Sequence, residues 1–184
     1  VETSSLAVGF NLLGNPFTSY VNSATFLGAA TSANLDQSQI WLWNGANGMY
    51  EVKILGEAWV LAPGQGFFVD VTSVGTVTFD ESNQAATGNL FQKSAKTEVK
   101  LVLTDGENNR FAKLNFGDNF SKGYDYGWEG ETFGGIPNSL SIFTALLEDN
   151  VGKRYQVQSL PNSDYESMVV PVGITAAVNK EITF

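Results

Sequence analysis

The chain has 184 residues, a formal net charge of −9 and a sequence pI of about 4.3, and it contains neither cysteine nor histidine. The missing cysteine excludes disulfides, thiolate metal sites and thiol nucleophiles, and the missing histidine excludes most hydrolase triads and most transition-metal sites. The ten Lys and Arg residues are scattered along the chain, so nucleic acid and anionic membranes are poor partners.

Nearly every apolar run is short, alternates with polar residues and ends at Gly, Asn, Asp or Pro, which predicts an all-β fold. A helix is expected only around residues 19–30, so less than about a tenth of the chain should be helical. The expected strands, in chain order, are 7–13, 39–44, 48–54, 58–61, 66–71, 75–79, 98–104, 110–116, 141–146, 155–159, 167–172 and 180–184.

The alternation lapses between residues 79 and 97, where polar and charged residues predominate as in an exposed linker. A boundary near 87–96 would separate two consecutive β-sandwich-like or jelly-roll-like modules, 1–95 and 96–184. We expect the second module to be truncated at its C-terminal end, because residues 180–184 alternate like a strand and nothing follows them. No run is long and apolar enough to insert into a membrane.

Four short motifs in the first half resemble a module common in large secreted and surface proteins of the Bacteroidetes. The motifs are GFNLLGNPF at 9–17, IWLWNG at 40–45, LAPGQGFFV at 61–69 and GTVTF at 75–79. They are similar to "GWNLLGNPYPS", "IYVWNG", "IAPGQGFFVKA" and "GTITF", in the same order.

The second half resembles the β-rich region that often precedes the C-terminal sorting domain of type IX secretion cargo. The similar segments are GYDYGWE at 123–129, LP at 160–161, VPVGI at 170–174 and EITF at 181–184. Glu129 stands where the family pattern "GFDxGYDA" has a second Asp. The resemblance implies a β-sandwich at the outer cell surface or outside the cell, in cargo that ranges from adhesins to polysaccharide-degrading enzymes.

Trp41 and Trp43 lie two residues apart on one expected strand, so both rings should point to the same face. We expect both in the sandwich core, because large aromatic side chains dominate the inner faces of β-sheets. The alternative is a stacking platform for sugar rings. Other aromatic residues that would then bind a polysaccharide are Trp59, Trp128, Tyr124 and Tyr126.

Two acidic stretches offer oxygen ligands suited to calcium. The first contains Asp105 and Glu107, and the second contains Asp118, Asp125 and Glu129. The alternative is that these are solvated carboxylates of turns. Asp125 and Glu129 are also the best candidates for a glycosidase pair, but we expect no catalysis, because an enzyme cleft normally takes residues from several strands of a larger scaffold.

The resemblance implies a segment of a larger secreted or cell-surface protein exported by type IX secretion, and together with the residue patterns it predicts a non-catalytic structural or adhesive role for this segment. Its partners would be other domains or chains of that protein. The alternative function is that of a carbohydrate-binding module attached to a glycan-degrading enzyme. Apart from calcium, no cofactor is expected.

Overall fold

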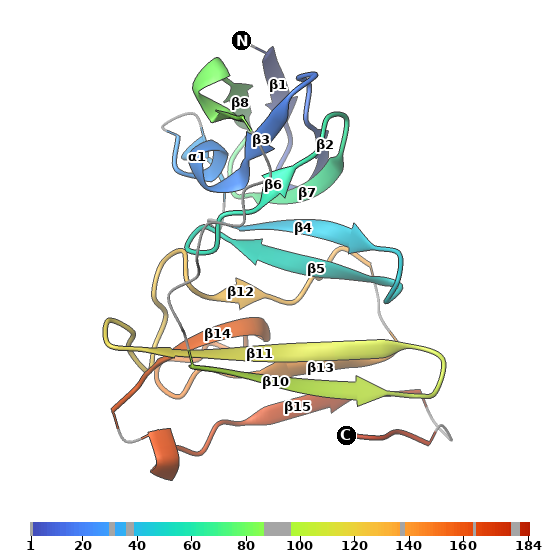
Figure 1. The fold of residues 1–184 in the computed structure, drawn as a ribbon, viewed down its shortest axis with the longest axis vertical. Coiled ribbons are helices and arrows are strands. Elements are labelled where there is room, and N and C mark those ends of the chain that lie inside the picture. Colours follow the sequence, from blue (N-terminus) through green and yellow to red (C-terminus); the bar gives the residue numbers. More distant parts are fainter. Residues whose placement is uncertain are drawn as a thin grey trace. The chain divides into compact units, whose positions relative to one another are not determined.

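The computed structural model describes residues 2–29, 32–35, 39–86, 97–136, 139–163, 165–177 and 181–184 (Figure 1). Strands make up 47% of the residues and helical turns 8%, which confirms the predicted all-β fold and its low helix content. The chain divides into two compact units, Val1–Leu42 with Lys53–Gln92, and Trp43–Val52 with Lys93–Phe184. The expected boundary at 87–96 lies outside the described residues.

The first unit is built from short antiparallel sheets. Strand β1 (Glu2–Leu6) pairs with β8 (Gly75–Phe79), and β3 (Tyr20–Asn22) lies between β6 (Val60–Leu61) and β9 (Gln84–Ala85). The largest sheet has the order β2 (Gly9–Gly14), β7 (Gly66–Val71), β4 (Gln39–Asn44) and β5 (Met49–Ile54). The last two residues of β4 and the first four of β5 belong to the second unit.

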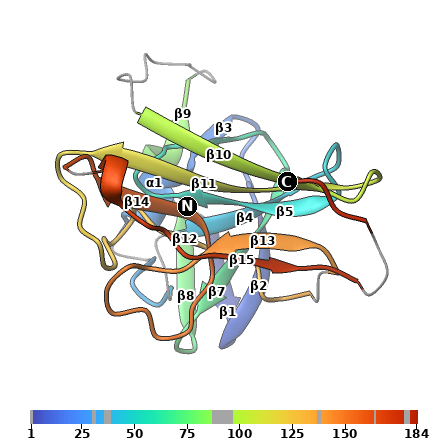
Figure 2. The same cartoon turned by 90° about the horizontal axis from the view of Figure 1, so that it is seen from below.

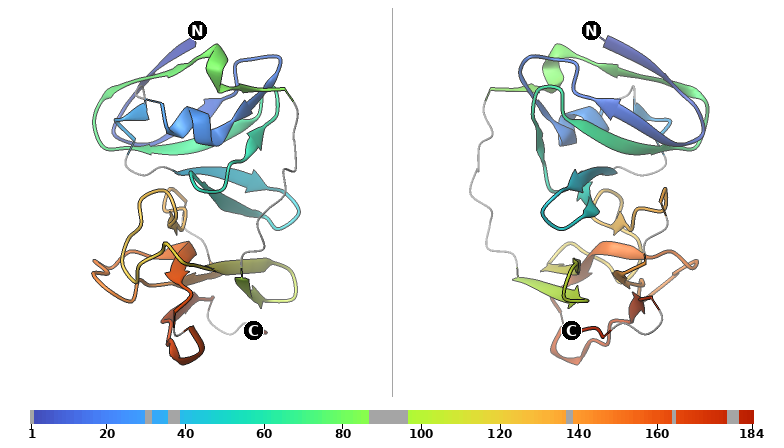
Figure 3. Two further views of the ribbon diagram at one scale, coloured as in Figure 1. Left: turned by 60° about the vertical axis from the view of Figure 1, so that its left-hand side comes forward. Right: turned by 90° about the vertical axis from the view of Figure 1, so that its right-hand side faces the viewer.

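The core of the first unit forms around the short helix α1 (Ser23–Leu27), and Figure 3 shows the strands curving around it. Phe26 is stacked on Phe79 at a centroid distance of 4.7 Å and meets Phe67 edge-on at 5.6 Å. The expected helix at 19–30 is therefore shorter, because Tyr20–Asn22 pairs as β3 and Asn22 caps the helix by accepting the Ala24 N–H.

The motif that follows β2 is held by the side chain of Asn15, which is buried. Its amide nitrogen donates to the carbonyls of Ser19, Leu61 and Ala62, and its oxygen accepts the Phe17 N–H at 3.0 Å. These bonds fix the turn to β6. The role of this motif in the fold is therefore structural.

The second unit contains one six-stranded sheet. Its order is β10 (Thr97–Thr104), β11 (Asn109–Gly117), β14 (Tyr155–Pro161), β13 (Ser141–Thr144) and β15 (Val172–Thr175), and β12 (Gly130–Glu131) also pairs with β14. The β11–β14 pair is parallel and the other pairs are antiparallel. Figure 2 shows β13 and β15 side by side.

The end of the chain differs from the prediction. Residues 167–172 do not form the expected strand, because a 3-10 turn, η3, occupies Tyr165–Ser167 and the paired strand begins only after Pro171, which has no N–H to donate. Residue 180 lies outside the described residues, and Thr183 forms an isolated antiparallel bridge with Thr104. The edges of the sheet are β10 and β15.

Candidate functional site

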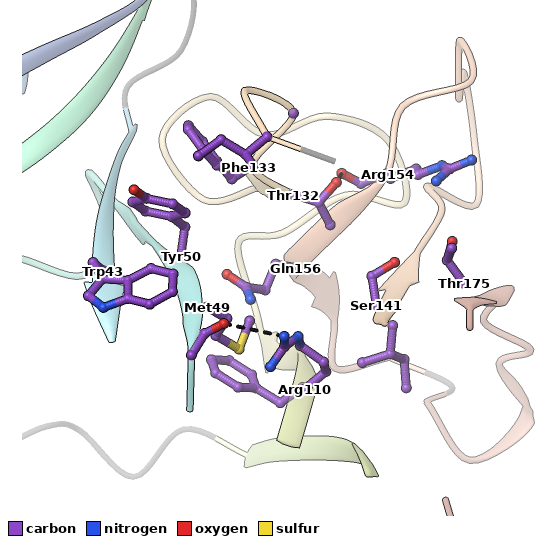
Figure 4. Close-up of a pocket in the computed structure, with 15 residues that line it drawn as sticks. Trp43, Met49, Tyr50, Arg110, Thr132, Phe133, Ser141, Arg154, Gln156 and Thr175 are labelled. Atoms are coloured by element: carbon purple, nitrogen blue, oxygen red, sulfur yellow. Dashed lines mark hydrogen bonds between the residues drawn. The ribbon is translucent and has the colours of Figure 1, made fainter. Parts of the chain in front are cut away.

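A groove of about 860 Å³ lies within the second unit (Figure 4). Its walls come from four places in the sequence: the turn between β4 and β5, the start of β11, the loop after β12, and the strands β13 to β15. Figure 4 shows Trp43 and Tyr50 at one end of this groove and Arg154 toward the other, with Arg110 and Gln156 between them. Concave sites that combine aromatic walls with a few fixed polar groups are typical of small-molecule binding.

Three aromatic rings form one wall of the groove, and we call them the aromatic row. The Trp43 ring lies 5.0 Å from that of Tyr50, and the Tyr50 ring lies 4.4 Å from that of Phe133, measured between centroids. Trp43 is 57% exposed, whereas Tyr50 and Phe133 are half-buried. The row therefore presents a large apolar surface to a ligand and keeps its rings in place by contacts between them.

The turn between β4 and β5 places Trp43 and Tyr50 next to each other. The side-chain oxygen of Asn44 accepts the N–H of Ala46 at 2.9 Å, and its amide nitrogen donates to Glu51 at 2.6 Å. Gly48 adopts a φ of +58°, a left-handed conformation that glycine adopts without strain. The Asn44-Gly45 and Asn47-Gly48 pairs therefore form the turn between two strands that the sequence predicts at 39–44 and 48–54.

Arg110 anchors this turn to the sheet of the second unit. Arg110 as a whole is only 6% exposed, and its guanidinium donates to the carbonyls of Leu140 (3.0 Å), Asn47 (2.7 Å), Asn109 (3.0 Å) and Gly48 (3.3 Å). Burial lowers the pKa of Arg110, and Asp105 opposes this shift. Because arginine stays protonated in proteins, a fixed positive charge lies in the wall of the groove.

Two further contacts hold the walls. The side-chain oxygen of Gln156 in β14 accepts the N–H of Val52 in β5 at 2.8 Å. At the other end, the Arg154 guanidinium lies 4.5 Å from the centroid of the Phe143 ring, and Phe143 pairs across the sheet with Gly173. A Cβ at Gly173 would collide with the Phe143 ring, so the glycine leaves the space in which Phe143 supports Arg154.

The structure places the six aromatic residues considered for ligand binding in different surroundings. Trp41 is 2% exposed and packs edge-on against Phe10, so it is a core residue as expected. Trp43 is exposed and lines the groove, and its placement in the core was therefore wrong. Both faces of β4 are buried from Gln39 to Leu42, and Trp43 lies just beyond that cover.

Three of the remaining four candidates lie on the loop between β11 and β12 and do not line the groove. Tyr124 and Tyr126 are exposed, and Trp128 is half-buried against Phe120 at a centroid distance of 5.0 Å. Trp59 is exposed in the first unit, where Lys53 lies 4.0 Å from its ring centroid.

The carboxylate of Glu129 connects the loop between β11 and β12 to strand β14. One carboxylate oxygen accepts the Asp125 N–H at 2.6 Å and the other accepts the Ser159 N–H at 3.2 Å. Although these donors favour the charged form, burial dominates and raises the pKa of Glu129 to about 8. Burial, together with the Glu129 charge, also raises the pKa of Tyr124 well above its ordinary value.

The structure does not bring the five expected calcium ligands together. Asp105 accepts the N–H groups of Glu107 and Asn108, Asp118 accepts from Asn162, and Asp125 accepts from Ser121. Among the residues that the structure describes, no group of three or more Asp and Glu side chains is close enough to hold a metal ion. These carboxylates satisfy loop donors instead, mostly backbone N–H groups.

Sequence reasoning missed most of the groove. Tyr50 was predictable, because a hairpin turn at 44–48 brings positions 43 and 50 together. Arg110, Phe133 and the neighbouring pair Arg154 and Gln156 come from three distant parts of the sequence, and no local pattern links them. Their convergence depends on the order of the strands.

Comparison of the sequence with protein-family models and with curated proteins gave no match, and comparison of the fold with solved structures gave none either. In the described part of the chain, no helix has the length and apolar character needed to cross a membrane.

Proposed function

We propose that this chain is a non-catalytic, glycan-binding segment of a larger secreted or cell-surface protein. The observation that carries the proposal is the aromatic row, in which a 57% exposed Trp43 is supported by Tyr50 and Phe133 along a groove. The C–H faces of sugar rings pack on aromatic rings as other apolar surfaces do. Groove walls that also present hydroxyl, amide and guanidinium groups can bind the sugar hydroxyls.

Two features support a binding role without catalysis. The described residues that line the groove include no Asp or Glu, whereas glycoside hydrolysis uses a pair of carboxylates across the sugar. Asp125 and Glu129, the pair considered from the sequence, accept backbone N–H groups of their own loop and, for Glu129, of Ser159 in β14, and both lie outside the groove lining. The similarity of the sequence motifs to secreted Bacteroidetes modules supports an extracellular location and export by type IX secretion.

The test is retention of the purified chain in affinity gels cast with a panel of neutral and acidic polysaccharides. We expect slower migration with at least one polysaccharide, and Trp43→Ala should weaken that binding by about 30-fold, the effect of losing a central aromatic contact. Trp59→Ala is the matched control, because Trp59 is also exposed but belongs to the first unit.

Two results would contradict the proposal. One is the absence of retention with every polysaccharide, which would favour a purely structural or adhesive role for the segment. The other is an equal loss of binding in Trp43→Ala and Trp59→Ala, because the groove would then not be the binding surface.

A further inference from the structure

The charge of the groove is opposite to that of the chain. The protein has 19 acidic and 10 basic residues, yet the described residues that line the groove include two arginines, Arg110 and Arg154, and no acidic residue. A polyanion is repelled by the rest of such a surface, so this local reversal favours an anionic group only inside the groove.

The two arginines have different roles. Arg110 is fixed by four carbonyl groups, which orient the guanidinium but carry no net charge to cancel it. Arg154 is exposed and rests on Phe143, and its guanidinium has no carboxylate partner among the described residues. The backbone carbonyl of Arg154 accepts both the N–H and the hydroxyl of Thr132, at 2.9 and 3.3 Å, which fixes the start of its side chain.

We infer that the groove binds an anionic polysaccharide, with sugar rings on the aromatic row and a carboxylate or sulfate group at Arg154. This inference rests on the proposed function and names the substrate class. The planar guanidinium of arginine binds carboxylate and sulfate oxygens through two parallel N–H bonds, which a neutral sugar cannot match. Ser141 and Thr175 pair across β13 and β15 and add hydroxyl groups to the part of the groove where Arg154 lies (Figure 4).

The test uses pairs of polymers that share a backbone and differ in charge. Suitable pairs are polygalacturonate with its methyl ester, alginate with carboxyl-reduced alginate, and dextran sulfate with dextran. We expect the chain to bind the charged member of at least one pair at least about tenfold more tightly than the neutral member. The first two pairs report on carboxylate and the third reports on sulfate. Polyglutamate, an anionic polymer without sugar rings, should not bind.

Arg154→Gln should remove most of this preference, lowering affinity for the charged polymer by about tenfold and leaving affinity for its neutral partner unchanged. Lys122→Gln is the matched control, because it removes the same charge from an exposed position outside the groove. Thermal unfolding of both variants should match that of the original chain, because neither side chain is buried.

The outcomes separate the two proposals. Equal binding of charged and neutral partners, lost in Trp43→Ala, would overturn the inference of an anionic ligand and leave glycan binding intact. Binding of no polysaccharide at all would overturn both. Binding of polyglutamate as tightly as of the anionic polysaccharides, or equal losses in Arg154→Gln and Lys122→Gln, would show general attraction to polyanions and would also overturn the inference.

Discussion

The same substitution at two positions of β4 should have opposite consequences. Trp41 and Trp43 are two residues apart, yet Trp41 is 2% exposed and Trp43 is 57% exposed. Trp41→Ala should therefore lower the free energy of unfolding strongly, whereas Trp43→Ala should mainly remove ligand binding.

The magnitudes follow from the buried areas. A buried tryptophan side chain removes about 200 Å² from water, which at about 25 cal/mol per Å² corresponds to about 5 kcal/mol. Truncation of buried tryptophan typically costs about 3–5 kcal/mol, so Trp41→Ala should fall in that range. Less than half of the Trp43 side chain is buried, which limits the loss in Trp43→Ala to about 2 kcal/mol.

The assay is urea unfolding followed by far-UV circular dichroism, because fluorescence would lose part of its signal with each tryptophan. The two units need not unfold together, so the transitions should be fitted separately where two are resolved. A loss in Trp43→Ala as large as that in Trp41→Ala would refute the reasoning, since both rings would then belong to a core.

Three other perturbations test the described contacts. In the folded chain Glu129 keeps its proton up to about pH 8, whereas in the unfolded chain a glutamate loses its proton above its ordinary pKa of 4.5. The free energy of unfolding of the original chain, measured relative to that of Glu129→Gln, should therefore fall as the pH rises from 4.5 to 8. Arg110→Met should lower the free energy of unfolding by about 2 kcal/mol or more, because the buried carbonyls lose their donor. It should also speed the hydrogen exchange of backbone amides in residues 43–52. Lys113→Met, which removes a positive charge from the same strand, is the control. Millimolar calcium and a chelator should give the same thermal midpoint, because the Asp105 carboxylate accepts backbone N–H groups of its own turn.

Each of these has a clear contrary result. A flat difference in stability between pH 4.5 and 8 would show that the two N–H donors to Glu129 outweigh its burial. Unchanged exchange in residues 43–52 after Arg110→Met would show that this turn is held by other contacts. A midpoint that rises with calcium concentration would show a site that binds the folded chain.

The strands that the sequence predicted best are those whose ends are set by turn-forming residues next to them in the sequence. Strands β4, β7 and β8 begin and end at the predicted residues, because short apolar runs there meet Gly or Asn turns. Strand β1 was missed because residues 2–5 are polar, and only its pairing with β8 makes it a strand. A strand that depends on a partner distant in the sequence need not show the alternation of a strand in its own residues.

The same limit applies to the groove. The spacing of Trp41 and Trp43 predicted that both rings share one face of β4 and lie in the core, but exposure depends on what covers each residue, and that cover ends at Leu42. Arg154 lines the groove because Phe143 and Gly173 pair on adjacent strands. This pairing depends on the order of β13, β14 and β15, which no single segment encodes.

The assignment of Trp43–Val52 to the second unit limits how this protein can be divided. A fragment that begins at residue 97 would carry the whole six-stranded sheet but would lack Trp43, Tyr50 and two of the four carbonyls that Arg110 binds, those of Asn47 and Gly48. Genetic exchange or proteolysis at one point between the halves would therefore separate the groove from Trp43 and Tyr50, two of the three residues of its aromatic row. Both halves of the sequence must be inherited together for the groove to exist.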